Sequence, residues 1–153
     1  MHRLAESLYS VSLTLWVGGM WVIGYFVTPT LFAAVADRQL AGMLAGKLFI
    51  LMGWVGIGCA VYMLLFMLFS MGWAVFKRWR FWAVFVMLLL TQIALFGIQP
   101  LMVQLKADAF PRDVMESLLH DRFAMWHGIA SVLYLAQSLL GFALVLGAGR
   151  NVK

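Results

Sequence analysis

The chain has 153 residues, of which 65% are hydrophobic and only 11% are charged, and its mean hydropathy is +0.96. Because a soluble domain averages about 25% charged residues, this composition predicts an integral membrane protein. The net charge of +5 does not indicate a nucleic-acid-binding protein, since the basic residues flank apolar segments and form no basic face. The single cysteine, Cys59, excludes an intramolecular disulfide and a cysteine-based zinc or iron–sulfur site.

Four long runs of the sequence contain no Asp, Glu, Lys or Arg: 7–36, 48–76, 81–105 and 123–149. Each exceeds the ~20 residues that a helix needs to cross the hydrocarbon layer. The sequence therefore predicts an all-α fold, a four-helix transmembrane bundle that forms a single integral membrane domain over 1–153. The predicted helices cover about 7–35, 46–75, 80–105 and 111–147. The first run is also too long for the ~7–15-residue apolar region of a signal peptide, so we expect a retained helix.

The first predicted helix carries a polar stripe on one face, made by Ser10, Thr14, Trp21, Tyr25 and Thr28. Lipid offers no hydrogen-bond partner, so this stripe should face other helices. Pro29 should kink the outer end of the helix, because proline removes a backbone hydrogen bond.

The second predicted helix, 46–75, follows an amphipathic segment, 36–47, which either lies at the membrane surface or extends the helix. Gly53, Gly56 and Gly58 predict that it packs closely against its neighbours, because small residues let helix backbones approach.

The third predicted helix, 80–105, carries Gln92 and Gln99 on one face, and Pro100 should bend its end. Pro111 marks the start of the fourth helix, because the first helical position suits a residue without a backbone N–H.

The short basic turn Lys77-Arg78-Trp79-Arg80 is the strongest orientation signal. Short basic loops are retained in the cytoplasm, so we expect both termini to be cytoplasmic. Basic residues beside apolar spans also contact anionic lipid, so the lipid bilayer is the first predicted partner. Nucleic acid is not a predicted partner.

His127 is the strongly polar ionisable residue within a charge-free run, and such residues are costly to place in a membrane unless they have a function. On a helical wheel, six further polar residues of the fourth helix fall within about 40° of it: Asp113, Glu116, His120, Ser131, Tyr134 and Ser138. We therefore expect His127 to face the bundle interior and to touch the first or third helix.

The candidate metal ligands are His127, His120 and Glu116, and the candidate cofactor-binding residues are His127, Ser131 and Tyr134; no catalytic residue is predicted. Glu116 and His120 are i,i+4 neighbours and could form a ligand pair. His120 and His127 lie about 10 Å apart along the axis and cannot bind one ion together without a helix break. His127 would need partners from other helices, namely Gln92, Gln99, Tyr25 or Thr28.

Three functional interpretations follow from this stripe. It could conduct a cation or proton through its histidines. His127 could be an axial ligand to a haem between helices. Soft ligands could bind copper or another transition metal, since there are 11 methionines, four of them on one face of the second helix: Met52, Met63, Met67 and Met71. The alternative is that His127 is a hydrogen-bonded tie between helices.

The sequence resembles the bacterial four-span membrane proteins grouped with human transmembrane protein 205. The resemblance is carried by a Trp-Val-Gly-Gly element and a His-Gly-x-x-Ser element, within segments 13–19, 28–32, 41–49 and 123–131. The resemblance implies a multi-pass protein of the bacterial inner (plasma) membrane with no settled activity. The association of the human member with platinum-drug resistance implies metal handling or secretory traffic. Ala130 and Tyr134 replace a serine and an asparagine that are common in this family.

The opening helix more distantly resembles CopD-type copper-resistance proteins and HemJ-type protoporphyrinogen oxidases. Both tend to carry a histidine before the tryptophan of this helix, where this chain has Tyr9 and Ser10. That absence argues against bis-histidine haem ligation.

Together these observations favour a small inner-membrane protein that handles a metal ion or protons at His127 over an enzyme. The alternatives are a haem-binding membrane oxidoreductase and a structural or assembly subunit that contacts other membrane proteins or a second copy of itself.

Overall fold

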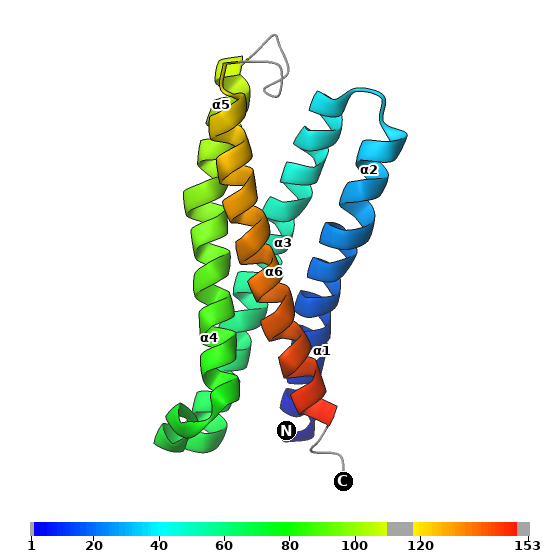
Figure 1. The fold of residues 1–153 in the computed structure, drawn as a ribbon. Coiled ribbons are helices and arrows are strands. Elements are labelled where there is room, and N and C mark those ends of the chain that lie inside the picture. The colour runs from blue at the N-terminus through cyan, green and yellow to red at the C-terminus, as the bar shows by residue number, and fades with distance from the viewer. Residues whose placement is uncertain (1, 110–117, 150–153) are drawn as a thin grey trace.

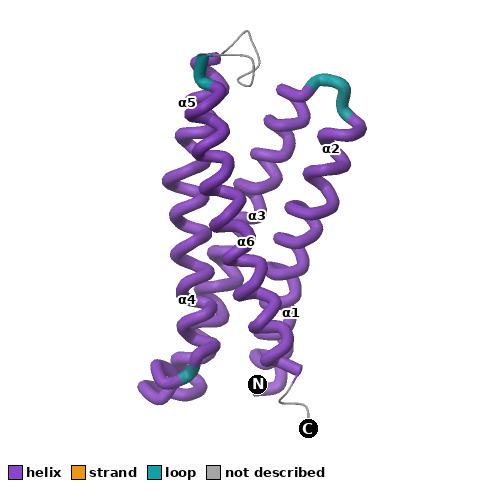
Figure 2. Tube along the Cα trace, viewed as in Figure 1, coloured by secondary structure: helices purple, strands orange, loops and turns teal. Residues whose placement is uncertain are grey.

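The computed structural model describes residues 2–109 and 118–149, and within them every regular element is a helix (Figures 1 and 2). Four helical segments are long and apolar enough to cross a membrane: Arg3–Ala34, Arg38–Lys77, Trp79–Ala109 and His120–Ala148. The predicted all-α architecture, with four helices long and apolar enough to cross a membrane, is therefore confirmed for the described residues. Both described chain ends lie at the same end of the bundle as the turn between the second and third spans (Figure 1).

The first span is built from α1 (His2–Trp21), a π-helical segment η1 (Val22–Val27) and α2 (Thr28–Ala34). Pro29, at the second position of α2, has no N–H to bond the preceding turn, and the widened π turn accommodates this loss. The carbonyl of Ile23 accepts from both the backbone N–H and the hydroxyl of Thr28, the latter at 2.8 Å.

The third span repeats this arrangement, with α4 (Trp79–Gln92), a second π-helical segment η3 (Ile93–Ile98) and α5 (Gln99–Ala109). Pro100 is again the second residue after the π segment. The two prolines that predicted bends are thus each preceded by a wide turn. Such turns change which side chains face the neighbouring helix.

The second span consists of α3 (Arg38–Met71) and the 3-10 segment η2 (Gly72–Lys77). The carboxylate of Asp37 caps α3 by accepting from the backbone N–H groups of Gln39 at 2.8 Å and Leu40 at 3.2 Å. Because this cap starts the helix at 38, segment 36–47 extends the second helix, which was one of its two predicted positions. Gly72, with φ of +55°, ends α3.

The fourth span is α6 (His120–Gly149), which begins later than the predicted start near 111. Leu118 and Leu119 form a turn before it, and Pro111, Asp113 and Glu116 lie outside the described residues. At 30 residues, α6 is about 45 Å long, which exceeds the ~30 Å hydrocarbon layer.

α3 and α6 each pack against both α1 and α4. The core between them is apolar, and its largest fully buried side chains include Trp16, Met63, Met87 and Leu144. α6 crosses the bundle obliquely: it lies beside α5 at one end and beside α1 at the other (Figure 1). This crossing decides which of its polar residues face the interior.

Candidate functional site

His127 is exposed on the outside of the bundle, so the prediction that it faces the interior is wrong. Its ring stacks on Phe123 of the same helix, with centroids 5.9 Å apart and planes at 11°. Lys106 of α5 covers the Phe123 ring, with Nζ 5.6 Å from the centroid, and donates to the carbonyl of Gly42 at 3.1 Å. Because α6 is longer than the hydrocarbon layer, its outer turns extend to headgroup depth, where an imidazole needs no protein partner.

Two of the three predicted metal ligands, His120 and His127, are described, and both side chains are exposed. The imidazole Nδ1 of His120 lies 3.0 Å from a carboxylate oxygen of Asp121, and both side chains are exposed. Glu116 lies outside the described residues. Across residues 2–109 and 118–149, no group of three or more His, Cys, Asp or Glu side chains is placed to hold a metal ion.

The predicted cofactor residues of α6 face different surroundings. Ser131 is exposed and donates to the carbonyl of His127 in its own helix at 2.8 Å. Tyr134 faces α1, where its hydroxyl donates to the carbonyl of Met20. The Tyr134 ring meets those of Tyr25 and Phe49, with centroids 6.0 Å and 5.4 Å away. The polar residues on this face of α6 therefore do not share one environment. The face points out of the bundle where α6 lies beside α5 and into the bundle where α6 lies beside α1.

The most buried polar contact joins α6 to α4. Its two side chains, Gln137 and Thr91, were not among the residues predicted from the sequence. The buried amide of Gln137 donates to the hydroxyl of Thr91 at 2.5 Å and to the carbonyl of Met87 at 3.3 Å. Thr91 in turn donates to the Met87 carbonyl at 2.8 Å. These bonds satisfy polar groups within an apolar core, so this contact ties two helices together.

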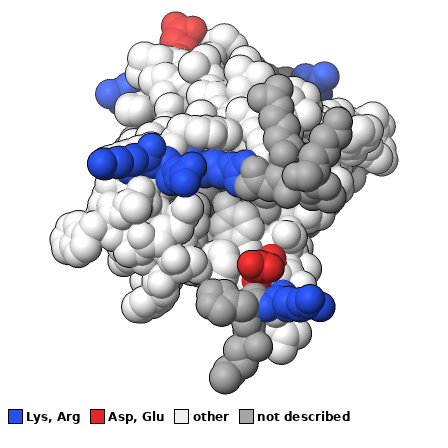
Figure 3. All heavy atoms as spheres, turned by 90° about the horizontal axis from the view of Figure 1, so that it is seen from below, with Lys and Arg blue, Asp and Glu red and all other residues white. Residues whose placement is uncertain are grey.

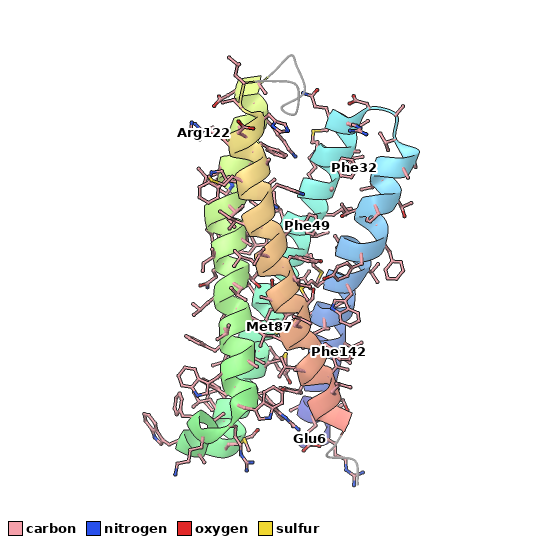
Figure 4. All side chains as sticks on the ribbon, viewed as in Figure 1. Glu6, Phe32, Phe49, Met87, Arg122 and Phe142 are labelled. Atoms are coloured by element: carbon pink, nitrogen blue, oxygen red, sulfur yellow. The ribbon has the colours of Figure 1, made fainter. Side chains whose placement is uncertain are left out.

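A groove of about 370 Å³ lies between the first span and α6. Three aromatic rings dominate its lining, and its full lining is Trp21, Tyr25, Leu135, Ser138, Leu139 and Phe142. The ring of Trp21 stacks on that of Phe142, with centroids 5.9 Å apart, and meets Tyr25 edge-on at 6.5 Å. Figure 4 shows Phe142 on the part of α6 that lies beside α1. Tyr25 belongs to η1, so the π turn helps to form the groove.

Two lining residues of this groove, Ser138 and Trp21, carry polar groups with unused hydrogen-bonding capacity among the described residues. The hydroxyl of Tyr25 donates to Ser138 Oγ at 3.0 Å, and Ser138 donates to no described residue. The indole Nε1 of Trp21 is enclosed by protein atoms and has no acceptor among the described residues. A buried donor without an acceptor costs about 1–3 kcal/mol, so the groove walls would be stabilised by an acceptor atom.

The groove is expected to lie near the centre of the bilayer. At the end of α6, Arg80 donates to the carbonyl of Gly147, and Trp79 lies against the same glycine. Arg and Trp side chains mark the membrane interface. Ser138 is about 13 Å of helix axis away from Gly147, which is close to half of the ~30 Å hydrocarbon thickness.

A second groove, of about 270 Å³, lies beside the other π segment, η3, and serves as a comparison. Its lining is Ile50, Trp54, Leu95, Phe96, Gln99, Pro100 and Val103. No buried donor without a partner lines this groove among the described residues. The groove between η1 and α6 therefore combines greater volume with unsatisfied donors.

The other predicted partners of His127 are engaged elsewhere or exposed. Tyr25 bonds Ser138, Thr28 bonds its own helix, Gln92 is exposed and Gln99 lines the second groove. Sequence reasoning placed Tyr25 and Trp21 on an inward stripe but missed their convergence with Ser138. The sequence showed one polar stripe on the first helix and one on the fourth helix. It did not indicate that the two stripes meet.

In comparisons with known proteins, a family model described as a domain of unknown function (DUF4149) matches residues 11–111. No curated protein and no solved structure matches the chain. The resemblances to transmembrane protein 205 and to CopD- and HemJ-type proteins are not among these matches and stay predictions.

Proposed function

Since the chain belongs to the DUF4149 family, whose description gives no activity, we propose its function from the groove: it binds a lipid-soluble small molecule that carries an acceptor oxygen. The observation that carries this proposal is the aromatic-lined groove, one of whose lining residues, Trp21, has an enclosed indole N–H without an acceptor among the described residues. Small-molecule sites are largely apolar, occupy about 300–1,000 Å³ and contain a few convergent polar groups.

The depth of the groove narrows the ligand class. Phospholipid ester groups lie at the edge of the hydrocarbon layer, whereas Ser138 is expected near its centre. The acceptor must therefore belong to a largely apolar molecule that brings an oxygen to that depth, such as a ring carbonyl on an alkyl chain. Ser138 donates its hydroxyl hydrogen to this oxygen, and Tyr25 supports Ser138 by donating to Oγ. The indole of Trp21 supplies a second donor when its ring turns toward the ligand.

The test uses the purified protein in nanodiscs of dioleoylphosphatidylcholine, titrated with decylubiquinone while tryptophan fluorescence is recorded. We expect saturable quenching by decylubiquinone. Decylbenzene, which has an alkyl chain and a ring but no oxygen, should not compete with decylubiquinone for binding. The double variant Tyr25→Phe/Ser138→Ala should bind roughly threefold to tenfold more weakly, because one or two hydrogen bonds are lost. Trp54→Phe, in the second groove, should bind normally. Quenching that rises linearly without saturation, or equal competition by decylbenzene, would refute the proposal.

The protein is further proposed to lie in the bacterial inner membrane with both termini in the cytoplasm, which is supported by the basic turn at the end of the bundle where both described chain ends lie. A cysteine introduced at Lys77 in the Cys59→Ser background should resist a membrane-impermeant maleimide added to intact spheroplasts and react after lysis. Labelling before lysis would show the opposite orientation.

Metal or proton handling at His127, haem binding and an assembly role stay predictions, and the same purified sample tests the metal, haem and assembly roles. Stoichiometric copper that is lost on His127→Ala would support metal handling. A Soret band lost on the same substitution would support haem. A co-purifying membrane protein, with neither signal, would support the assembly role.

A further inference from the structure

The turn that joins the second and third spans has a conformation fixed by several contacts. Gly72 ends α3, and the following η2 segment is anchored by Val75, whose side chain is fully buried. The backbone N–H of Arg78 donates to the carbonyl of Val75 at 2.9 Å. The indole of Trp82 donates to the carbonyl of Phe76 at 2.9 Å, and the rings of Phe76 and Phe81 meet edge-on at 5.0 Å. The turn is therefore a defined surface.

This surface combines exposed aromatic rings with cations. Among the exposed rings of the turn, Trp73 is 88% exposed, Trp79 51% and Trp82 49%. The exposed side chains of Lys77 and Arg78 lie beside them. Figure 3, which views the molecule from this end, shows Lys and Arg atoms in a continuous band.

Within the described part of the chain, the cations of this turn form no ion pair with a carboxylate. Among the described residues, the ion pair formed is that of His120 with Asp121, at the other end of the bundle. The sequence contains no Asp or Glu between Asp37 and Asp108, so neither helix beside the turn supplies an acid. Arg80, which is partly buried, bonds the Gly147 carbonyl at the end of α6 and is held in place beside the other two cations.

We propose that this turn binds the headgroup of one anionic phospholipid, with Lys77 and Arg78 contacting the phosphate and the aromatic rings contacting the glycerol and upper acyl chain. Tryptophan rings prefer headgroup depth, and cations next to a membrane attract anionic lipid. The exposed rings favour a lipid over a free anion, because a free phosphate would leave them uncovered. This site is separate from the groove and does not depend on the function proposed above.

The test is native mass spectrometry of the full chain in detergent with added dioleoylphosphatidylglycerol, dioleoylphosphatidylcholine or inorganic phosphate. We expect preferential binding of phosphatidylglycerol. The variant Lys77→Gln/Arg78→Gln should weaken that binding by at least tenfold, since each cation contributes roughly a fivefold change in affinity. The variant Arg38→Gln/Lys47→Gln removes the same charge from exposed positions at the other end of α3 and should change affinity less than twofold.

The charge-conserving variant Lys77→Arg/Arg78→Lys should retain binding, which separates loss of charge from loss of structure. Equal weakening by the Arg38 and Lys47 variant would show a response to net charge alone and overturn the proposal. Equal binding of phosphatidylcholine, or displacement of phosphatidylglycerol by millimolar inorganic phosphate, would also overturn it.

Discussion

Gly56→Ala is expected to lower the free energy of unfolding of the bundle by about 1–3 kcal/mol, the usual cost of overpacking a close-packed core. A methyl group at Gly56 would collide with the indole ring of Trp16. Trp16 is only 1% exposed and belongs to the central apolar cluster, so the ring has no free space to enter. The measurement is equilibrium unfolding in mixed micelles, followed by circular dichroism.

Gly58→Ala is the matched control, because it makes the same change two positions away on the same helix. A methyl group there would meet nothing within 4 Å, since Gly58 faces outward. Alanine is favoured over glycine in a helix by up to about 1 kcal/mol, so this variant should be neutral or slightly more stable. Equal destabilisation by both substitutions would show that the α1–α3 packing described here is wrong.

Trp21→Phe is expected to weaken decylubiquinone binding roughly threefold to tenfold while changing the free energy of unfolding by less than about 1 kcal/mol. The indole N–H has no acceptor among residues 2–109 and 118–149, so its removal breaks no hydrogen bond among them. Phenylalanine keeps an aromatic ring to stack on Phe142 and to meet Tyr25. Fluorescence is unsuitable after loss of this tryptophan, so binding is measured by equilibrium partition of the quinone between protein-containing and empty nanodiscs.

The control for Trp21→Phe is Trp54→Phe, which makes the same change in the second groove. It should leave binding unchanged. If Trp21→Phe destabilises the bundle strongly and binding falls only in proportion to the folded fraction, Trp21 is a packing residue and the indole N–H has no role in recognition.

The four spans were predictable because charged side chains are excluded from hydrocarbon, and this rule acts locally on the sequence. The true start of the second helix was less predictable, because Asp37 caps α3 well outside the apolar run. The prolines indicated where the first and third helices deviate. They did not indicate that the departure from α-helical geometry is a π turn, since a proline can also produce a kink.

The site was less predictable than the fold, and His127 shows why. A helical wheel assigns one direction to each residue, but α6 crosses from α5 to α1, so one direction meets different neighbours along its length. His127 and Ser131 are consequently exposed, while Ser138 is buried against Tyr25. Gln137 hydrogen-bonds Thr91 because the same crossing brings this part of α6 against α4. These pairings depend on tertiary packing, which no single span encodes.

The most direct test of the proposed binding groove is to locate the bound molecule. An azide-bearing decylubiquinone analogue is photolysed with the full chain in nanodiscs, and adducts are mapped by peptide mass spectrometry. The proposed function predicts saturable adducts at 21–25 and 135–142, which excess decylubiquinone suppresses. Adducts concentrated at 50–54 and 95–103, or spread over all lipid-facing segments and insensitive to competitor, would contradict it.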